Sequence, residues 1–188
     1  MQLAGQSMFR YIVYRQSDSW IRIYNYMFYI IMGVSGTGKS TIGKLLSNRT
    51  GWDFYDADDF HSPANIDKMN RGIPLTDSDR RPWLEDLQQL IQTTLANDQT
   101  AILACSALKS NYRQILQHNS SEVVFIYLQG DFRCIQSRIE SRSEHFMNSD
   151  LLKSQFDTLE EPKNAIIIDV SLAPEAIVEE ILQAIELF

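Results

Sequence analysis

The sequence predicts an α/β protein whose five-stranded parallel sheet carries helices on both faces. Short apolar segments alternate along the chain with longer segments whose apolar residues recur at helical spacing. Such alternation is typical of a doubly wound sheet, in which helices cross over between parallel strands. A glycine-rich loop joins the first strand to the first helix. We expect strands at residues 26–32, from residue 52, and at 100–105, 123–128 and 165–170.

The glycine-rich loop spans residues 33–40 and fits the phosphate-binding pattern G-x-x-x-x-G-K-[ST] at every fixed position. Glycines let the backbone curl so that N–H groups point at phosphate oxygens, Lys39 reaches the β- and γ-phosphates, and the Ser40 hydroxyl ligates Mg²⁺. An apolar strand before the loop and a helix at 41–50 after it supply the expected context. The predicted nucleotide-binding residues are Gly33, Val34, Ser35, Gly36, Thr37, Gly38, Lys39, Ser40 and Thr41.

The composition is that of an ordinary globular domain, with 188 residues, 44% hydrophobic, 22% charged and a formal net charge of -7. This acidity argues against nucleic acid as a main partner, although a local group of Lys and Arg still suits a small anion. No apolar stretch approaches the length of a membrane span. Cys105 and Cys134 lie in apolar surroundings, which favours buried thiols in a reducing cytoplasm.

Residues 1–26 lack a clean period of either 2 or 3.6. We expect them to form an extension outside a single domain over residues 27–188, because the strand before a phosphate loop usually lies near the start of such a fold. Met27 stands where a natural start would fall. The alternative is an added strand, since residues 11–14 and 21–24 have β-propensity.

Acidic residues follow the second predicted strand. Asp56 and Asp58 are two positions apart, so an extended segment places both on one face. Ligands of open α/β sheets bind outside the carboxyl ends of the strands, where the phosphate loop also lies. We therefore expect functional roles for both carboxylates beside that loop, and a solvated turn for Asp59.

Basic residues gather in the next segment. A short helix is expected over residues 63–71, a turn follows, and a longer helix starts near Arg80. Solvated charge on a helical hairpin and a clamp for an anionic substrate both explain this pattern. The basic residues are Lys68, Arg71, Arg80 and Arg81.

Two later helices carry further candidates. Ser106 is placed to cap the helix after the third strand, and Lys109 in its first turn opposes the helix dipole, which favours a ligand role. Asp131 is expected to cap a helix on which Arg138 and Arg142 are four positions apart and share a face. The polar stretch 143–150 suits a mobile lid.

Three absences in the sequence narrow the class of nucleotide-binding protein. No Asn-Lys-x-Asp follows an apolar strand, the third strand ends in Cys105 and Ser106 rather than an acid, and no long motor region exists. The acid on the metal side is then Asp56, at the end of the second strand. This arrangement suits kinases of small metabolites.

Four parts of the chain carry residue patterns beyond the phosphate loop: 54–63 with Lys68-Met69, 74–84, 105–109 with Tyr112-Arg113, and 155–162. They resemble the gluconokinase family, a family of P-loop kinases of small metabolites. The ordered match runs from about residue 28 to the C-terminus, and residues 1–26 have no counterpart in it. Its Cys-Ser-Ala-Leu-Lys and Asp-x-Asp-Arg-x-Pro-Trp-Leu stretches are more specific than the phosphate loop.

The resemblance implies an adenylate-kinase-like architecture with a helical substrate segment at about 61–82 and a lid at about 142–156. It also implies ATP-dependent phosphorylation of D-gluconate to 6-phospho-D-gluconate, with Mg²⁺ at Ser40 and Asp56. For this chemistry Asp58 orients the attacking hydroxyl and accepts its proton. Lys39 and Arg142 stabilise the transferring phosphoryl group, and Arg138 stacks on adenine. The predicted substrate-binding residues are Asp58, His61, Arg80, Lys109 and Arg113.

Two alternatives stay open at this point. Another small-metabolite kinase, for example one acting on shikimate, would share everything except the middle motifs. A non-enzymatic nucleotide-binding regulator would have no use for Asp58 or for the cationic clamp. The expected partner is a small molecule and neither nucleic acid nor a membrane, and the sequence leaves monomer and homodimer open.

Overall fold

The computed structural model describes residues 11–16, 19–24, 26–141 and 149–187, and a five-stranded parallel sheet forms its centre. The strand order is β4-β5-β3-β6-β7. β3, which comes first of these strands along the chain, therefore lies in the middle of the sheet. Phe28 of β3 pairs with Ala101 on one side and Val123 on the other. The predicted sheet is confirmed. Its strands are β3 (Phe28–Met32), β4 (Asp53–Asp56), β5 (Ala101–Ala104), β6 (Val123–Gln129) and β7 (Ile166–Asp169).

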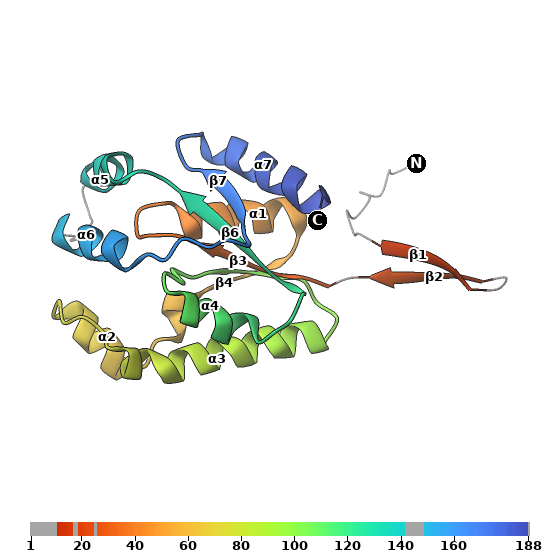
Figure 1. The fold of residues 1–188 in the computed structure, drawn as a ribbon, viewed down its shortest axis with the longest axis horizontal. Helices are drawn as coiled ribbons and strands as arrows, with labels where there is room; N and C mark the ends of the chain where they lie inside the picture. The colour runs from red at the N-terminus through yellow and green to blue at the C-terminus, as the bar shows by residue number, and fades with distance from the viewer. Residues whose placement is uncertain (1–10, 17–18, 25, 142–148, 188) are drawn as a thin grey trace.

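Helices cover both faces of the sheet (Figure 1). One layer holds α1 (Lys39–Thr50) and α7 (Pro174–Leu187), and the opposite layer holds α3 (Asp77–Ala96) and α4 (Ser110–Gln117). A short helix η1 (Ala57–Phe60) and α2 (Pro63–Asn70) connect β4 to α3. The remaining helices, α5 (Phe132–Glu140) and α6 (Ser149–Thr158), pack on each other.

The middle strand shows why the sequence folds into these layers. All five residues of β3 are buried, and successive side chains point to opposite faces. Ile30 belongs to the cluster that includes Leu87 of α3, whereas Ile31 belongs to the cluster that includes Leu46 of α1. An apolar strand of this kind fits only between two helical layers.

Two helix starts differ from expectation. The prediction that the long helix starts near Arg80 is wrong, because α3 begins at Asp77 under a capping box. In this box Thr76 Oγ1 accepts from the Asp79 N–H at 3.2 Å, and the Asp79 carboxylate accepts from the Thr76 N–H at 2.9 Å. Pro82 therefore lies inside the helix.

The predicted cap at Ser106 is also wrong. The loop after β5 turns through Ala107, which has a φ of 44°, and α4 begins only at Ser110. Lys109 is consequently the residue that precedes the helix, at its N-cap position, rather than a member of the first turn.

A separate hairpin precedes the main sheet. β1 (Tyr11–Gln16) and β2 (Ser19–Tyr24) pair antiparallel in a two-stranded sheet of their own. Figure 1 shows the hairpin projecting from the end of the molecule opposite α2. The β-propensity of these residues is thus realised without a strand added to the five-stranded sheet. That residues 27–188 fold without residues 1–26 stays a prediction. In the described ranges, no helix combines the length and apolar character needed to cross a membrane.

Candidate active site

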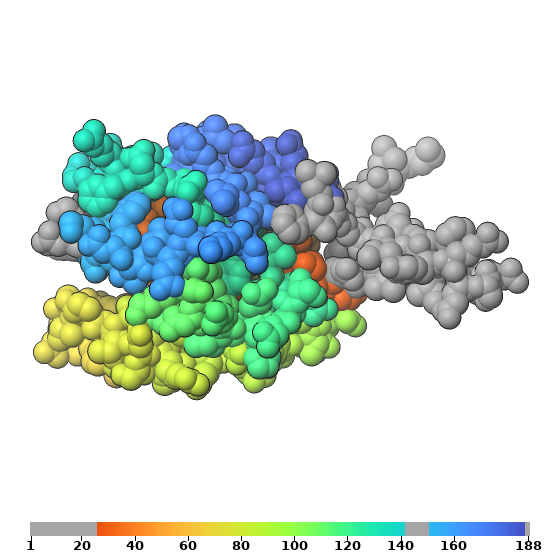
Figure 2. Space-filling model, viewed as in Figure 1, coloured from red at the N-terminus to blue at the C-terminus, as the bar shows by residue number. Residues whose placement is uncertain are grey.

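The parallel sheet brings the predicted site residues to one edge. The phosphate loop follows β3, Asp56 ends β4, and the loop that leads to Lys109 follows β5. Because all five strands run in the same direction, their carboxyl ends share this edge, where ligands of open α/β sheets bind. Figure 2 shows α2, in yellow, and α6, in blue, on opposite sides of the same end of the molecule.

The phosphate loop is closely packed, and two of its glycines are needed for that packing. A Cβ on Gly33, which has a φ of 144°, would stand 2.9 Å from the Leu128 carbonyl oxygen. A Cβ on Gly36, which has a φ of 86°, would stand 2.7 Å from the Ile139 side chain. The loop therefore lies directly against the end of β6 and against α5, as only glycine allows.

The Val34 carbonyl accepts two side-chain hydrogen bonds from within the phosphate loop. It accepts from the buried Thr37 hydroxyl at 2.9 Å and from the Lys39 ammonium at 3.0 Å. Burial lowers the pKa of Lys39, and the negative charges of Asp58 and Asp56 act in the opposite direction. The lysine is thus held inside the loop with two carboxylates close enough to attract it.

Asp56 links the loop to the neighbouring strand. Ser40 Oγ donates to Asp56 Oδ2 at 2.6 Å, while Asp56 Oδ1 accepts from the Asp58 N–H at 3.2 Å. The Ser40 hydroxyl hydrogen is directed at Asp56, so the lone pairs of its oxygen face away from that carboxylate. A hydroxyl and a carboxylate side by side are hard oxygen donors of the kind that Mg²⁺ prefers.

Asp58 lies in η1, the short helix that begins after Asp56. The residue is exposed, yet the protein atoms around its carboxylate desolvate it and raise its pKa, and the charge of Asp56 raises it further. The charges of His61 and Lys39 oppose this shift. A carboxylate with a raised pKa beside a phosphate loop is suited to receive a proton.

His61 has an unpaired nitrogen. Its ring stacks on Trp83 at a centroid distance of 4.5 Å and an interplanar angle of 14°. Trp83 is fixed in turn, because its Nε1 donates to the Ala57 carbonyl at 2.7 Å. Nδ1 of His61 is buried and has no hydrogen-bond partner among the described residues. Burial lowers the pKa of His61, which favours a neutral imidazole.

The cations on the acceptor side form a cluster around Asp77, which the sequence analysis placed in a turn and gave no role. Lys109 Nζ lies 2.8 Å and 3.0 Å from the two Asp77 carboxylate oxygens, and the Tyr112 hydroxyl donates to Oδ1 at 2.5 Å. These hydrogen bonds, from Lys109 first, lower the pKa of Asp77. The Arg80 guanidinium lies 6.0 Å from the Tyr112 ring centroid and donates to the Leu75 carbonyl. Arg80 and Lys109 are therefore brought together.

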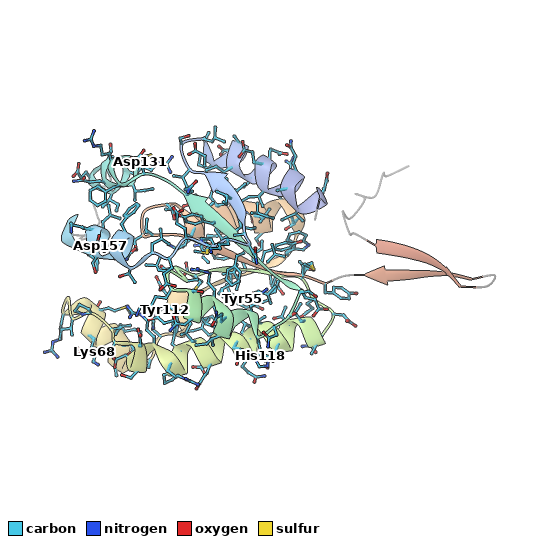
Figure 3. The ribbon with its side chains drawn as sticks, viewed as in Figure 1. Tyr55, Lys68, Tyr112, His118, Asp131 and Asp157 are labelled. Atoms are coloured by element: carbon cyan, nitrogen blue, oxygen red, sulfur yellow. The ribbon has the colours of Figure 1, made fainter. Side chains whose placement is uncertain are left out.

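The other basic residues of the segment formed by α2 and the start of α3 have structural partners. Lys68 pairs with Asp79 at 2.7 Å and so joins α2 to α3. Arg71, just after α2, forms an exposed pair with Asp67 of that helix, and Arg81 forms an exposed pair with Glu85 within α3. Figure 3 shows Lys68 and Tyr112 on the α2 and α3 side of the sheet. For Arg71 and Arg81, solvated charge on a helical hairpin is the better description.

Two predicted arginines bind backbone carbonyls. Arg113 is buried and donates to the carbonyls of Ala107 and Leu108, both at 2.9 Å, which shapes the loop after β5. Arg138 donates to the Val170 carbonyl at the end of β7. The substrate and adenine roles assigned to them stay predictions. Arg142 and the lid residues 142–148 lie outside the described residues, and the rest of the expected lid belongs to α6.

One contact at the loop had no counterpart in the sequence analysis. Gln155 of α6 bonds both the N–H and the hydroxyl of Ser35. Gln155 does belong to a segment that resembles gluconokinases, but nothing in the sequence indicates that it meets a residue 120 positions away.

Because a lysine and a magnesium-type serine and carboxylate pair meet at the carboxyl edge of a parallel sheet, the fold and the site define a P-loop kinase. A family model described as shikimate kinase matches residues 35–186. A gluconokinase of Arabidopsis thaliana is 46% identical over 170 residues, covering 82% of this chain and 90% of that protein. The thermosensitive gluconokinase of Escherichia coli (strain K12) is 42% identical over 161 residues, covering 84% and 86%.

The solved structures agree. A crystal structure of a gluconokinase from Sinorhizobium meliloti 1021 superposes with a TM-score of 0.77 at 37% identity, covering 85% of this chain and 91% of that one. The chain belongs to the gluconokinase family, as the sequence resemblance predicted.

Proposed function

We propose that the protein transfers the γ-phosphoryl group of ATP to D-gluconate and forms 6-phospho-D-gluconate, with Mg²⁺ bound. The observation that carries the reaction class is the hydrogen-bonded series from Ser40 through Asp56 to Asp58, which joins the phosphate loop to a carboxylate on the acceptor side. The choice of acceptor is supported by the relatives named gluconokinase.

The nucleotide half of the site works through the loop. Loop N–H groups and the Lys39 ammonium hold the β- and γ-phosphates, and Lys39 exchanges its bond to the Val34 carbonyl for phosphate oxygens. Arg138, which donates to the Val170 carbonyl just after β7, is proposed to stack on the adenine. Arg142 is proposed to neutralise the transferring group from the lid.

Ser40 and Asp56 are the residues that would hold Mg²⁺, and their oxygen donors fit it. The ion supplies positive charge to the phosphate oxygens. Asp56 contributes more than a ligand, because it also accepts the Asp58 N–H and so fixes the position of the next carboxylate.

Asp58 orients the attacking hydroxyl and accepts its proton. A raised pKa brings this carboxylate closer to the pH at which it works, so that it is ionised yet basic. Lys39, whose charge acts on Asp58, holds the phosphoryl donor on the other side of the same space.

The acceptor half fits a hydroxylated carboxylate. Arg80 and Lys109 carry two positive charges against the one negative charge of Asp77, so the cluster has one net positive charge for a carboxylate. His61 Nδ1 and the Tyr112 hydroxyl offer hydrogen bonds along a polyol chain. Shikimate is also a hydroxylated carboxylate, and the shikimate kinase family model makes it the second candidate.

We also place the enzyme in the cytoplasm as a monomer or homodimer. Cys105 and Cys134 are free thiols, which supports a reducing compartment. Burial raises the pKa of Cys105 to about 12 and keeps its thiol protonated. Cys134 is half-buried, so the expectation of two buried thiols is correct only for Cys105.

A substrate panel tests the proposal. ADP release is measured with ATP and Mg²⁺ in the presence of gluconate, shikimate, a nucleoside monophosphate or no acceptor. We expect turnover with gluconate and none above background with the others. Turnover with shikimate and not with gluconate would overturn the choice of acceptor and leave the kinase class standing.

A further inference from the structure

The contact between α6 and the phosphate loop is reciprocal. The Ser35 N–H donates to Gln155 Oε1 at 2.6 Å, and Gln155 Nε2 donates to Ser35 Oγ at 2.9 Å. A backbone N–H can only donate, so the amide oxygen faces it and the amide nitrogen faces the hydroxyl. The orientation of the Gln155 amide is thus fixed by its partner.

This contact leaves the Ser35 hydroxyl with a free hydrogen. Its oxygen accepts from Gln155, and no described residue accepts its hydrogen. The other hydroxyls of residues 33–40 differ, because Thr37 donates to the Val34 carbonyl and Ser40 donates to Asp56. Within the phosphate loop, Ser35 is the hydroxyl whose hydrogen is available to a ligand.

Gln155 stands on a well-anchored helix. Leu152 of α6 is 1% exposed, and Phe156 meets Phe132 of α5 edge to face at 5.4 Å. Glu160, just beyond the helix, donates from its N–H to the Leu108 carbonyl at 3.0 Å and accepts from the Ser110 N–H at 2.7 Å. α6 is therefore packed against α5, and Glu160 beyond its end is bound to the loop after β5 and to the start of α4.

We propose that Gln155 is a positioning residue that makes the Ser35 hydroxyl a hydrogen-bond donor to the γ-phosphoryl group. The inference rests on the proposed phosphoryl transfer from ATP. A serine hydroxyl left to itself rotates toward the nearest acceptor. With the Gln155 amide nitrogen on its oxygen, the hydroxyl hydrogen points away from α6. A donor already aimed at a phosphoryl oxygen needs no rearrangement when charge develops there.

A double-mutant cycle between Ser35→Ala and Gln155→Leu tests the inference. The deciding quantity is the ratio of affinities for AMPPNP and ADP, measured by titration calorimetry, because it isolates the γ-phosphoryl group and needs no acceptor. Each single variant is expected to lower this ratio by about tenfold, the usual effect of one charge-assisted hydrogen bond. The double variant is expected to fall no further, because both changes remove the same oriented donor.

Gln155→Glu separates the two bonds of the contact. Its carboxylate still accepts from the Ser35 N–H but accepts from the hydroxyl as well, so it turns the hydroxyl hydrogen away from the nucleotide. We expect a loss at least as large as that of Gln155→Leu. Lys153→Ala is the matched control on the exposed side of α6, where it removes only a surface pair with Asp157, and it is expected to keep the ratio.

Several outcomes would overturn the inference. These are losses that multiply in the double variant, an unchanged ratio in either single variant, or a wild-type ratio in Gln155→Glu. In gluconate assays the same variants should lower kcat without raising the KM for gluconate. A wild-type protein that ignores gluconate would overturn the proposed acceptor, whereas the calorimetric cycle would still decide the role of Gln155.

Discussion

The two halves of the site are built in different ways. In the phosphate half, backbone groups and glycine packing fix the loop, and Thr37 is buried under it. In the acceptor half, charged side chains hold one another at the surface, and the side chains of Lys109 and Asp77 are 30% and 57% exposed. The backbone of the phosphate half is preorganised, and of its described contacts only the bond from Lys39 to the Val34 carbonyl has to be exchanged for phosphate oxygens. The acceptor half has to exchange the ion pair between Lys109 and Asp77 for contacts with the substrate.

This difference separates affinity from specificity. A carboxylate that reaches Lys109 displaces part of an ion pair with Asp77, so the gain is smaller than for a free lysine. A ligand whose carboxylate meets the positive charge and whose hydroxyl groups bond the Tyr112 hydroxyl recovers this binding free energy. A simple anion does not. The acceptor half should therefore discriminate strongly while binding modestly.

Removing the loop lysine should have the largest effect. Lys39→Ala takes away the cation that meets the β- and γ-phosphates, and we expect kcat/KM for ATP to fall by roughly 10³ or more, with ATP affinity also reduced. Lys44→Ala, on the same helix but over the Phe54 ring, is the control. Steady-state kinetics and ATP titration check this, and intact ATP binding in Lys39→Ala would refute it.

Asp58→Asn comes next, and in the reaction it should affect kcat and not ATP binding. It keeps the shape of the side chain but removes its charge and basicity, and we expect kcat to fall by about 10², the lower end for a general base, because the proton leaves late. ATP affinity should stay near that of the wild type. A near-normal kcat would show that Asp58 is not the base.

The same variant should be more stable than the wild type at neutral pH. The folded-state pKa of Asp58 is raised, so the folded protein binds more protons than the unfolded chain, and this group lowers stability as pH rises through that range. Asn removes the penalty. Urea unfolding at pH 7 should therefore show a higher midpoint for Asp58→Asn, and a lower midpoint would contradict the assigned shift.

Lys109→Ala should confine its effect to the acceptor. Loss of one charged hydrogen bond to the gluconate carboxylate is expected to raise the KM for gluconate by about tenfold, with the KM for ATP unchanged. Arg81→Ala removes an exposed cation that pairs within its own helix, and it should change neither constant. An equal rise in both KM values for Lys109→Ala would erase the distinction between the halves.

Asp79→Asn should lower stability at neutral pH, with an effect that disappears in acid, and it should leave the chemistry unchanged. Hydrogen bonds from Lys68 and Thr76 lower the pKa of Asp79 to about 2, below its unfolded value. The stability it contributes is therefore complete above the unfolded pKa and disappears as pH falls from about 4 toward 2. Unfolding curves of wild type and variant should differ at pH 6 and converge near pH 2. Parallel curves down to pH 2 would rule this out.

The smallest effect is expected from removing residues 1–26. The hairpin forms a sheet of its own, so a protein that starts at Met27 should fold and keep its kinase activity. Circular dichroism and the gluconate assay check this. Loss of solubility or of most activity would show that these residues belong to the domain.

Local pattern was enough to predict the strands, the phosphate loop and the Asp131 cap, which accepts from the Cys134 N–H at 2.8 Å. Each of these depends on residues close together in sequence. The start of α3 differs from the predicted start near Arg80, because the capping box at Thr76 decides it. The start of α4 depends on a left-handed Ala107, a conformation that alanine rarely adopts and that no pattern announces.

The side-chain partners on the acceptor side could not be predicted in the same way. Asp77 and Lys109 are 32 positions apart and meet only because α3 and α4 pack together. The substrate role of Arg113 stays a prediction, and its sequence position does not reveal that it is buried and donates to two backbone carbonyls. Charge in a sequence indicates that a cation exists, and the fold decides what it faces.

The stack of His61 on Trp83 gives the molecule an optical reporter. An indole changes its emission when its neighbours change, and this indole stacks on the residue that ends η1, the short helix that carries Asp58. A second tryptophan, Trp52, stacks on Tyr29 in the opposite layer, at 5.1 Å. Trp20 of β2 is the third tryptophan of the chain, so the two signals are read in a protein that starts at Met27. There, light from Trp83 carries information about the acceptor side, and light from Trp52 provides an internal reference.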